Sequence, residues 1–387
     1  MKWESLTLGE LCRKYNGKIQ TGPFGSQLHQ SDYKKHGTPV VMPKDIVNDQ
    51  ISLESIARIE EKDVERLSKH TLKKGDIVFP RRGEISKRAL VREENEGFIC
   101  GTGCLKISIN SEHVSNLYLN YYLARKESVD WLENNAVGST MKNISGEILS
   151  NVPIELPPLS TQQKIAAILS AYDDLIENNL RRIRLLEEAA QHLYREWFVR
   201  FRFPGWEEVK VVNGLPEGWE KGKVEDLFIL QRGFDLPSHE RENGEYPIIA
   251  STGTVGYHSN FKVEPPGVVT GRSGTIGKVS FVDKPFWPLN TSLWVKKYFK
   301  CGPHFVYFFL KSFGLESFGG GVAVPSLDRN VIHSQSCVIP SDGILRKFEE
   351  IIYPFFLKIS NLEKQNQKLK EAREILLPRL MNQTIEV

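Results

Sequence analysis

The sequence predicts an α+β fold in which two similar mixed α/β domains are separated by two long helices that pair as a coiled coil. Three observations predict it: an internal repeat, a heptad-like apolar pattern after each copy of the repeat, and short apolar runs broken by turn residues within each copy. The expected boundaries are 1–157 for the first globular domain, 158–203 for the central helical spacer, 204–340 for the second globular domain and 341–387 for the C-terminal helical spacer.

Composition agrees with a globular protein of several domains. The chain has 387 residues, of which 26% are charged and 40% are hydrophobic, and this length suits two or three domains. We expect no membrane span, because no apolar run approaches about 20 residues. The N-terminal residues lack the apolar core of a signal peptide, and the five cysteines are scattered, so we expect a cytoplasmic protein without a metal site.

The internal repeat is the most informative feature of the sequence. Residues 75–87 (Gly-Asp-Ile-Val-Phe-Pro-Arg-Arg-Gly-Glu-Ile-Ser-Lys) resemble residues 267–278 (Gly-Val-Val-Thr-Gly-Arg-Ser-Gly-Thr-Ile-Gly-Lys). Before each copy stands another shared phrase, at 36–41 and at 244–249. The matches occur in the same order in both halves, which predicts two copies of one domain.

The framework strands of the two copies agree better than their loops. The loop Thr21-Gly-Pro-Phe-Gly-Ser-Gln27 and its counterpart Gln231-Arg-Gly-Phe-Asp-Leu-Pro237 have different sequences, although each has an aromatic residue that we expect at its tip. Because loops carry function on a shared scaffold, divergent loops indicate one type of task performed on two different targets.

The region after each copy shows apolar residues at alternating steps of four and three. Such a seam predicts helix-on-helix pairing, against the alternative that each helix packs only on its own globular half. Two asparagines interrupt the seam and should fix its register. Pro354 should break the second helix, and Ala171 marks the matching break in the first, so we expect a short helix before each long one. The pairing residues are Ile176, Asn179, Ile183, Leu186, Leu193, Leu362, Asn366, Leu369 and Leu376.

The search for catalytic motifs leaves one candidate. The sequence has no phosphate-binding loop of the form GxxxxGK[ST], so an NTPase is not expected. Asp76, Glu84 and Lys87 could hold Mg²⁺ in a nuclease. However, Glu84 aligns with Thr275 in the second copy, and a solvated surface strand pair is the simpler interpretation. A magnesium-dependent nuclease therefore stays as an alternative.

Basic residues in the best-matched repeat element favour nucleic-acid binding. Arg81, Arg82, Lys87 and Arg88 lie within strand-turn sequence, and the second copy retains Arg272 and Lys278. Such side chains neutralise phosphates, and arginine also reads guanine, although a charge run can simply be a solvated face. With the polar loop residues, the candidate DNA-binding set is Gln20, Thr21, Phe24, Ser26, Gln27, Arg81, Arg82, Lys87, Arg88, Arg232, Ser251, Thr252, Arg272, Ser273 and Lys278.

Several of these motifs resemble the DNA-specificity (S) subunit of Type I restriction–modification systems, the HsdS family. The resemblance covers essentially the whole chain. Its most specific parts are Gly22-Pro-Phe-Gly-Ser26, Gly75-Asp-Ile-Val78, the pairs Arg82-Gly83 and Ser273-Gly274, and Leu156-Pro-Pro-Leu-Ser-Thr-Gln-Gln-Lys-Ile-Ala166 at the entry to the first helix. The second helical region begins Pro340-Ser-Asp-Gly-Ile344 instead, which departs from this pattern.

The resemblance implies a non-catalytic subunit whose two target-recognition domains each read one half of a split, asymmetric site in double-stranded DNA. It also implies that the two helical spacers pack as an antiparallel coiled coil. It further implies that the chain recruits two methyltransferase (M) subunits and, in the full complex, restriction (R) subunits. S-adenosylmethionine, ATP and Mg²⁺ would then belong to those partners, and this chain would carry no cofactor. A silent specificity-like scaffold, which binds methyltransferase subunits without productive DNA reading, stays as a second alternative.

Overall fold

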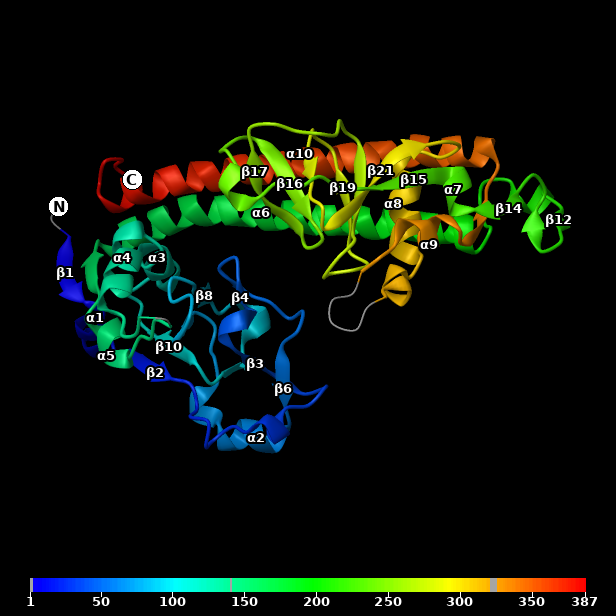
Figure 1. Cartoon of the computed structure of the whole chain (residues 1–387). Helices are drawn as coiled ribbons and strands as arrows, with labels where there is room; N and C mark the ends of the chain where they lie inside the picture. Colours follow the sequence, from blue (N-terminus) through cyan, green and yellow to red (C-terminus); the bar gives the residue numbers. More distant parts are fainter. Residues whose placement is uncertain (1–2, 140, 321–325) are drawn as a thin grey trace. The chain divides into compact units, whose positions relative to one another are not determined.

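The computed structural model describes residues 3–139, 141–320 and 326–387 (Figure 1). The chain forms two compact units: Met1–Ile176 together with Gln367–Val387, and Glu177–Asn366. Each unit contains one copy of the repeat and a part of each long helix, and the two units are described separately below.

The first unit is built on a four-stranded antiparallel sheet. Its strand order is β2-β10-β7-β8, and a smaller sheet of order β6-β3-β9 packs with it. Strand β1 pairs with β11 and so joins the two ends of the domain. The bounds are β1 Glu4–Thr7, β2 Lys18–Thr21, β3 Thr38–Val41, β4 Ile46–Val47, β5 Gln50–Ile51, β6 Ala57–Ile59, β7 Ile77–Pro80, β8 Ala89–Leu90, β9 Ile99–Cys100, β10 Cys104–Ser108 and β11 Pro153–Leu156.

The second unit repeats this topology. Its four-stranded sheet has the order β15-β21-β18-β19, its three-stranded sheet the order β17-β16-β20, and β14 pairs with β22. As in the first unit, one pair of the smaller sheet is parallel, here β16 with β20 and there β3 with β9. The bounds are β12 Val211–Val212, β13 Leu215–Pro216, β14 Glu220–Lys223, β15 Phe228–Arg232, β16 Tyr246–Ala250, β17 Gly253–His258, β18 Gly267–Gly271, β19 Val279–Val282, β20 Trp287–Pro288, β21 Ser292–Tyr298 and β22 Ser336–Ile339.

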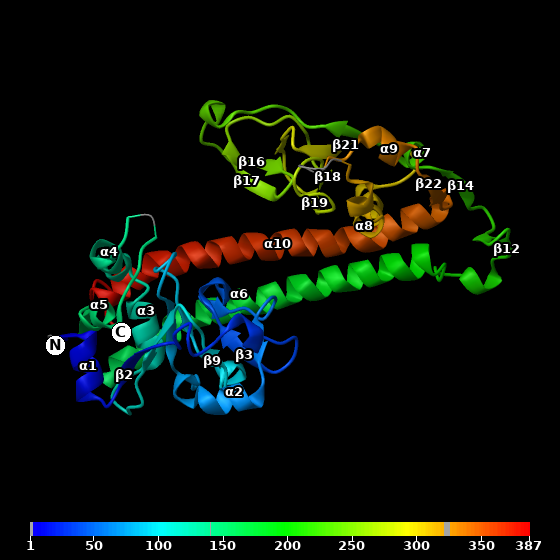
Figure 2. The ribbon, with the colours of Figure 1, turned by 60° about the horizontal axis from the view of Figure 1, so that its bottom comes forward.

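Short helices cover one side of each main sheet. In the first unit α1 starts at a capping box, in which Thr7 and Glu10 satisfy each other's backbone amides at 2.7 and 3.2 Å. In the second unit α8 lies between the main sheet and α10 (Figure 2), and its phenylalanines belong to the same core as Phe348 of α10. The bounds are α1 Leu8–Lys14, α2 Glu61–Arg66, α3 Asn116–Tyr122, α4 Lys126–Asn135, α5 Gly146–Ser150, α7 Val224–Leu227, α8 Pro303–Ser312 and α9 Arg329–His333.

The two long helices, α6 (Leu159–Tyr194) and α10 (Asp342–Met381), contact each other within each unit. In the second unit Asn179 Nδ2 donates to Asn366 Oδ1 at 2.9 Å. In the first unit Arg373 forms an ion pair with Asp173. Residue numbers rise along one helix as they fall along the other, so the helices are antiparallel. With the repeated domains, this confirms the predicted fold class.

The prediction of a break in each long helix is wrong. Helix α10 runs without interruption through Pro354, and α6 runs through Ala171. Pro354 is exposed, so the carbonyl of Glu350, which loses its backbone donor, faces water instead of a buried environment. The neighbouring Ile352 is fully buried and holds the helix against the core on the opposite face.

The ends of the long helices also belong to the domain cores, so packing on the globular halves and helix pairing occur together. Ile165, Leu169 and Leu380 lie in the core of the first unit, and Tyr194 and Phe348 lie in that of the second. The N- and C-terminal residues lie near each other in the first unit (Figure 2), where Trp3 and Val387 pack on the same core. Among the described helices, none has the length and apolar character needed to cross a bilayer.

Candidate nucleic-acid interface

In the first unit, one edge of the main sheet gathers most of the predicted binding residues. Thr21 at the end of β2 pairs with Leu105, and Pro80 at the end of β7 pairs with Cys104. The loop after β2 and the turn after β7 therefore leave the sheet on either side of the start of β10. We call this the first edge; it comprises residues 20–27, 81–88, 101–104 and 142–144.

The second unit has an equivalent edge. Arg232 at the end of β15 pairs with Leu293, and Gly271 at the end of β18 pairs with Ser292. The turn after β16 lies beside them, because the Lys278 ammonium donates to the carbonyl of Thr252. We call this the second edge; it comprises residues 231–237, 251–252, 271–278, 289–292 and 326.

Glycines give the two edges the same backbone. Gly83 and Gly274 both have φ of 83°, a left-handed conformation that a side chain disfavours. Gly22 and Gly233 lie so close to a neighbouring carbonyl that an added Cβ would come within 2.0 and 2.1 Å of its oxygen. These constraints explain why glycine recurs at both pairs of positions in the sequence repeat.

The loop at the first edge presents an aromatic side chain to solvent. Phe24 is 60% exposed and Ser26 is exposed. The Gln27 side chain accepts a hydrogen bond from the Phe24 amide at 3.1 Å and so holds the loop. The Gln20 amide donates to the carbonyl of Lys69 at 3.0 Å, next to the half-buried Thr21.

The basic residues of the first edge are not equivalent. Arg82 is exposed, whereas Arg81 is half-buried. Lys87 forms an ion pair with Glu84, which offsets its charge. Arg82 is therefore the arginine of this turn that is exposed to solvent and accessible to a phosphate or a base.

Arg88 differs from the prediction, because it is a core residue. Its side chain is 6% exposed and its Nε donates to the carbonyl of Asn120 at 2.9 Å. Burial lowers the pKa of this guanidinium, and Asp49, 3.7 Å away, opposes the shift. Arg88 is therefore held inside the first domain and is not part of the solvent-exposed surface of the first edge.

At the second edge the predicted residues are held by polar neighbours. Arg232 forms an ion pair with Asp235 at 3.1 Å, and the Arg272 guanidinium donates to the carbonyl of Asn290 at 3.3 Å. Ser251 is nearly buried, while Thr252 and Lys278 are exposed. The half-buried Ser273 pairs with Ser326 through a β-bridge.

The aromatic residue of the second loop does not lie at an exposed tip. Phe234 packs between Trp287 and Trp294, with ring centroids 6.4 and 6.3 Å apart. The loop after β15 thus presents Arg232 and Asp235, where the first edge presents Phe24. The two edges share a backbone and differ in the chemistry that they expose.

The carboxylates of the nuclease alternative do not converge. Asp76 is buried and accepts hydrogen bonds from the Lys73 amide at 3.1 Å and the Lys106 ammonium at 3.4 Å, whereas Glu84 is paired on the surface. Among residues 3–139, 141–320 and 326–387, no group of three or more His, Cys, Asp or Glu side chains could hold a metal ion. Nothing in this geometry favours a nuclease.

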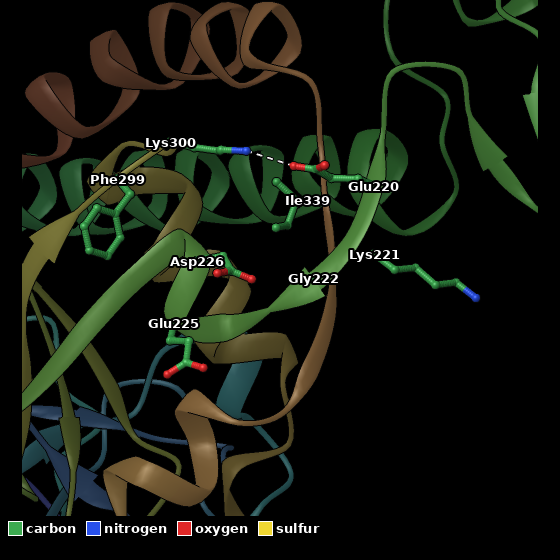
Figure 3. Close-up of a pocket in the computed structure, with 8 residues that line it drawn as sticks. All are labelled: Glu220, Lys221, Gly222, Glu225, Asp226, Phe299, Lys300 and Ile339. Atoms are coloured by element: carbon green, nitrogen blue, oxygen red, sulfur yellow. Dashed lines mark hydrogen bonds and ion pairs between the residues drawn. The ribbon is translucent and has the colours of Figure 1, made fainter.

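A hollow of about 520 Å³ lies beside β14 and β22 in the second unit (Figure 3). An ion pair between Glu220 and Lys300 spans part of it, and Glu225 and Asp226 add carboxylates. With Lys221 and Lys300, the lining holds three carboxylates and two ammonium groups, so its charge does not favour phosphate. No predicted DNA-binding residue lines the hollow, so the edges of the sheets are the better interface.

Residues that the sequence did not indicate also reach the first edge. Gly83 donates its amide to the carbonyl of Lys142 at 3.1 Å, and Ile144 donates to the carbonyl of Arg81 at 2.9 Å. This brings Asn143 beside Arg82 through a β-bridge. Ser326 occupies the matching place in the second unit. The two segments share no obvious phrase, so the sequence repeat carried no signal for them.

The fold and its paired edges define a family of DNA-recognition proteins. The family model for the Type I restriction modification DNA specificity domain matches residues 1–188 and 216–371, and the chain belongs to this family. The resemblance seen in the sequence is thereby confirmed. The chain is a non-catalytic DNA-recognition subunit of a Type I restriction–modification system.

Individual relatives agree over most of the chain. It is 29% identical over 377 residues to the Type I restriction enzyme MjaIX specificity subunit of Methanocaldococcus jannaschii, covering 89% of this chain and 85% of the relative. It is 22% identical to the HindI specificity subunit of Haemophilus influenzae, covering 98% and 99%. Its fold is similar to the crystal structure of the S subunit from M. genitalium, with a TM-score of 0.60 and 17% identity over 98% of this chain and 96% of that one.

Proposed function

We propose that the first and second edges each read one half of a bipartite, asymmetric site in double-stranded DNA. The observation that carries this proposal is the repeated edge: one backbone geometry, set by matched glycines, presents different side chains in the two domains. A shared frame suits the common duplex, and different side chains suit different bases.

The residues that we assign to DNA binding are those that lie at the first and second edges. Phe24, Ser26 and Arg82 are exposed at the first edge, and Arg232, Thr252 and Lys278 at the second. Arg88 is left out because it is buried. The full proposed set is Gln20, Thr21, Phe24, Ser26, Gln27, Arg81, Arg82, Lys87, Arg232, Ser251, Thr252, Arg272, Ser273 and Lys278.

We infer that the chain recruits two methyltransferase subunits and, in the complete complex, restriction subunits, and that it acts in the cytoplasm. Exposed apolar side chains on the long helices support recruitment: Leu180 and Leu185 on α6, and Tyr353 and Leu357 on α10. S-adenosylmethionine, ATP and Mg²⁺ would be bound by these partners. The modules of this function are the two recognition domains, 1–157 and 204–340, and the spacers, 158–203 and 341–387.

Methylation-site mapping in cells tests the proposal. The cognate methyltransferase is expressed with and without this chain, and methylated positions are read across the genome. We expect a bipartite motif with a fixed unspecified gap that disappears without the chain. Replacing residues 1–157 by those of a relative should change one half-site only. Unchanged methylation on removal of the chain would refute the recognition role and leave a silent scaffold.

A single substitution sharpens this test. Arg82→Ala should weaken one half-site only, because Arg82 belongs to the first edge. Arg13→Ala is the matched control, since Arg13 is an exposed arginine on α1 away from the sheet edge. Equal loss on all sequences would show that Arg82 contacts phosphate and reads no base.

A further inference from the structure

The two long helices repeat each other, as the two recognition domains do. Ile165 of α6 and Phe348 of α10 hold equivalent positions, each in the core of its own unit. Because the helices are alike, α6 could pair with α10, with the α6 of a second chain, or α10 with a second α10. Three seam positions carry the same residue in both helices and so suit all of these pairings: Ile176 and Ile359, Leu186 and Leu369, and Leu193 and Leu376.

The asparagines are seam positions at which the two helices differ in polarity. Asn179 of α6 corresponds to Leu362 of α10, and Asn366 of α10 corresponds to Ile183 of α6. In the second unit the asparagines meet each other, because the Asn179 amide donates to Asn366 Oδ1 at 2.9 Å. The same antiparallel register sets Ile183 opposite Leu362. Polar residues therefore face polar ones, and apolar residues face apolar ones.

An ion pair in the first unit is a second polar match between the helices. The Arg373 guanidinium of α10 donates to Asp173 of α6. The hydroxyl of Tyr121 on α3 donates to the other oxygen of that carboxylate at 2.5 Å. Both oxygens of Asp173 are thus paired where the two helices meet.

The equivalent place in the second unit is apolar. In the alignment of the two helices, Phe356 of α10 corresponds to Asp173, and Ala190 of α6 corresponds to Arg373. Ala190 is fully buried, and Phe356 packs on the same core. Helix α8, the counterpart of α3, contributes Phe308, whose ring centroid is 6.0 Å from that of Phe356. The two units thus fill one place with opposite chemistry.

A pair formed by two copies of the same helix would lose both matches. Since one copy would take the place of the other helix, each polar residue would face the apolar residue at the equivalent position. Each polar group that is buried without a partner disfavours such a pair by roughly tenfold or more. The residues that would meet are Asn179 with Ile183 and Asp173 with Ala190 between two α6 helices, and Asn366 with Leu362 and Arg373 with Phe356 between two α10 helices.

We propose that the asparagine pair and the Asp173–Arg373 ion pair select the pairing of α6 with α10 and exclude helix pairs between two copies of this chain. Polar seam residues specify a partner in this way, because the wrong partner leaves them unpaired. The selection keeps one copy of each recognition domain on a helix pair, whereas two α6 helices would combine two copies of the first domain. It acts on the assembly of the chain and does not depend on what the edges bind.

The test makes the two helices alike at these positions. In the symmetric variant, each polar residue is replaced by the residue at the equivalent position of the other helix. The full chain is unfolded in denaturant, refolded at several chain concentrations, diluted, and analysed by size-exclusion chromatography with light scattering. We expect the wild type to refold as a monomer and the symmetric variant to form at least roughly tenfold more dimer. This dimer should survive dilution, because its helices are exchanged between chains. The four substitutions are Asn179→Leu, Asn366→Ile, Asp173→Phe and Arg373→Ala.

A reversed ion pair is the matched control. Asp173→Arg/Arg373→Asp keeps opposite charges within the chain and leaves both self-pairings mismatched, so it should refold as a monomer. Asn179→Leu/Asn366→Ile is a milder variant that keeps the contact between Tyr121 and Asp173, and it should give an intermediate share of dimer where the symmetric variant fails to fold. A persistent dimer of the wild type or of the reversed variant would overturn the proposed selection. So would the absence of added dimer in the symmetrised variants that fold, as judged by circular dichroism.

Discussion

The buried asparagine pair between the long helices yields a quantitative prediction. Asn179 and Asn366 are 5% and 6% exposed, and the Asn179 amide nitrogen donates to the Asn366 oxygen at 2.9 Å. The Asn179 oxygen also accepts a hydrogen bond from Arg182 at 3.4 Å. The perturbation is Asn366→Leu, which removes the acceptor and leaves the Asn179 amide nitrogen buried and unpaired.

The expected loss follows from that unpaired group. Leaving a buried amide donor without a partner costs about 1–3 kcal/mol. For a unit of this size, each kcal/mol lowers the melting temperature by about 2–4 °C, so Asn366→Leu should melt several degrees below the wild type. The double variant Asn179→Leu/Asn366→Leu removes donor and acceptor together and restores an apolar seam, so it should melt at or above the wild-type temperature.

The measurement is thermal unfolding followed by circular dichroism. The wild type, the single variants Asn179→Leu and Asn366→Leu and the double variant together form a double-mutant cycle. Lys364→Leu, an exposed change on the same helix, controls for the general effect of an added leucine. The reasoning is refuted if the two single losses simply add in the double variant, because the amides would then be energetically independent.

Three further predictions concern single residues. Burial lowers the pKa of His333, whose Nε2 accepts a hydrogen bond from the Leu230 amide at 2.9 Å. The neutral imidazole therefore stabilises the folded chain fully above the ordinary histidine pKa of about 6.5, and this stabilisation is lost as pH falls through the lower pKa of the folded state. His333→Gln should therefore flatten the decline of melting temperature between about pH 7 and pH 5, and an unchanged slope would assign that decline to other groups. Pro354→Ala restores a backbone donor for the carbonyl of Glu350. It should increase the free energy of unfolding by at most about 3 kcal/mol and so raise the melting temperature. No rise in a thermal melt would mean that the carbonyl is already satisfied. Arg88→Met should lower the melting temperature and expose the chain to limited proteolysis, because it removes a buried hydrogen bond; wild-type resistance would contradict a core role.

Much of the fold was predictable because the sequence that encodes it is repeated and periodic. The buried positions of a helix with a heptad-like seam can be predicted without knowing its partner. Every seam residue from Ile165 to Trp197 is indeed buried or half-buried. The repeat predicted two domains of one topology, and the matched sheets confirm it. The continuity of α10 was not predictable from Pro354 alone, because the effect of a proline depends on whether the freed carbonyl faces water or protein.

The candidate site was predictable in part. Strand ends and glycine turns placed the loop at 21–27 and the turn at 81–88 among the binding residues, and the structure brings these two segments to one edge. The sequence did not reveal that Arg88 turns into the core or that Phe234 packs between tryptophans. It also did not reveal Asn143, because its place beside Arg82 arises from backbone hydrogen bonds between distant segments.

The sequence by itself determined the duplication and the two helical seams, because repetition and periodicity are properties of the order of residues. Its motifs also resembled those of the family to which the chain belongs. Only the tertiary structure decided which side chains of the repeated turn face solvent. Arg82 and Arg88 lie in the same basic run, yet one is exposed and the other donates to the carbonyl of Asn120 inside the domain. The direction of a side chain from a turn depends on the backbone conformation and on the neighbours that fill the space beneath it, and both are set by contacts between segments far apart in the chain.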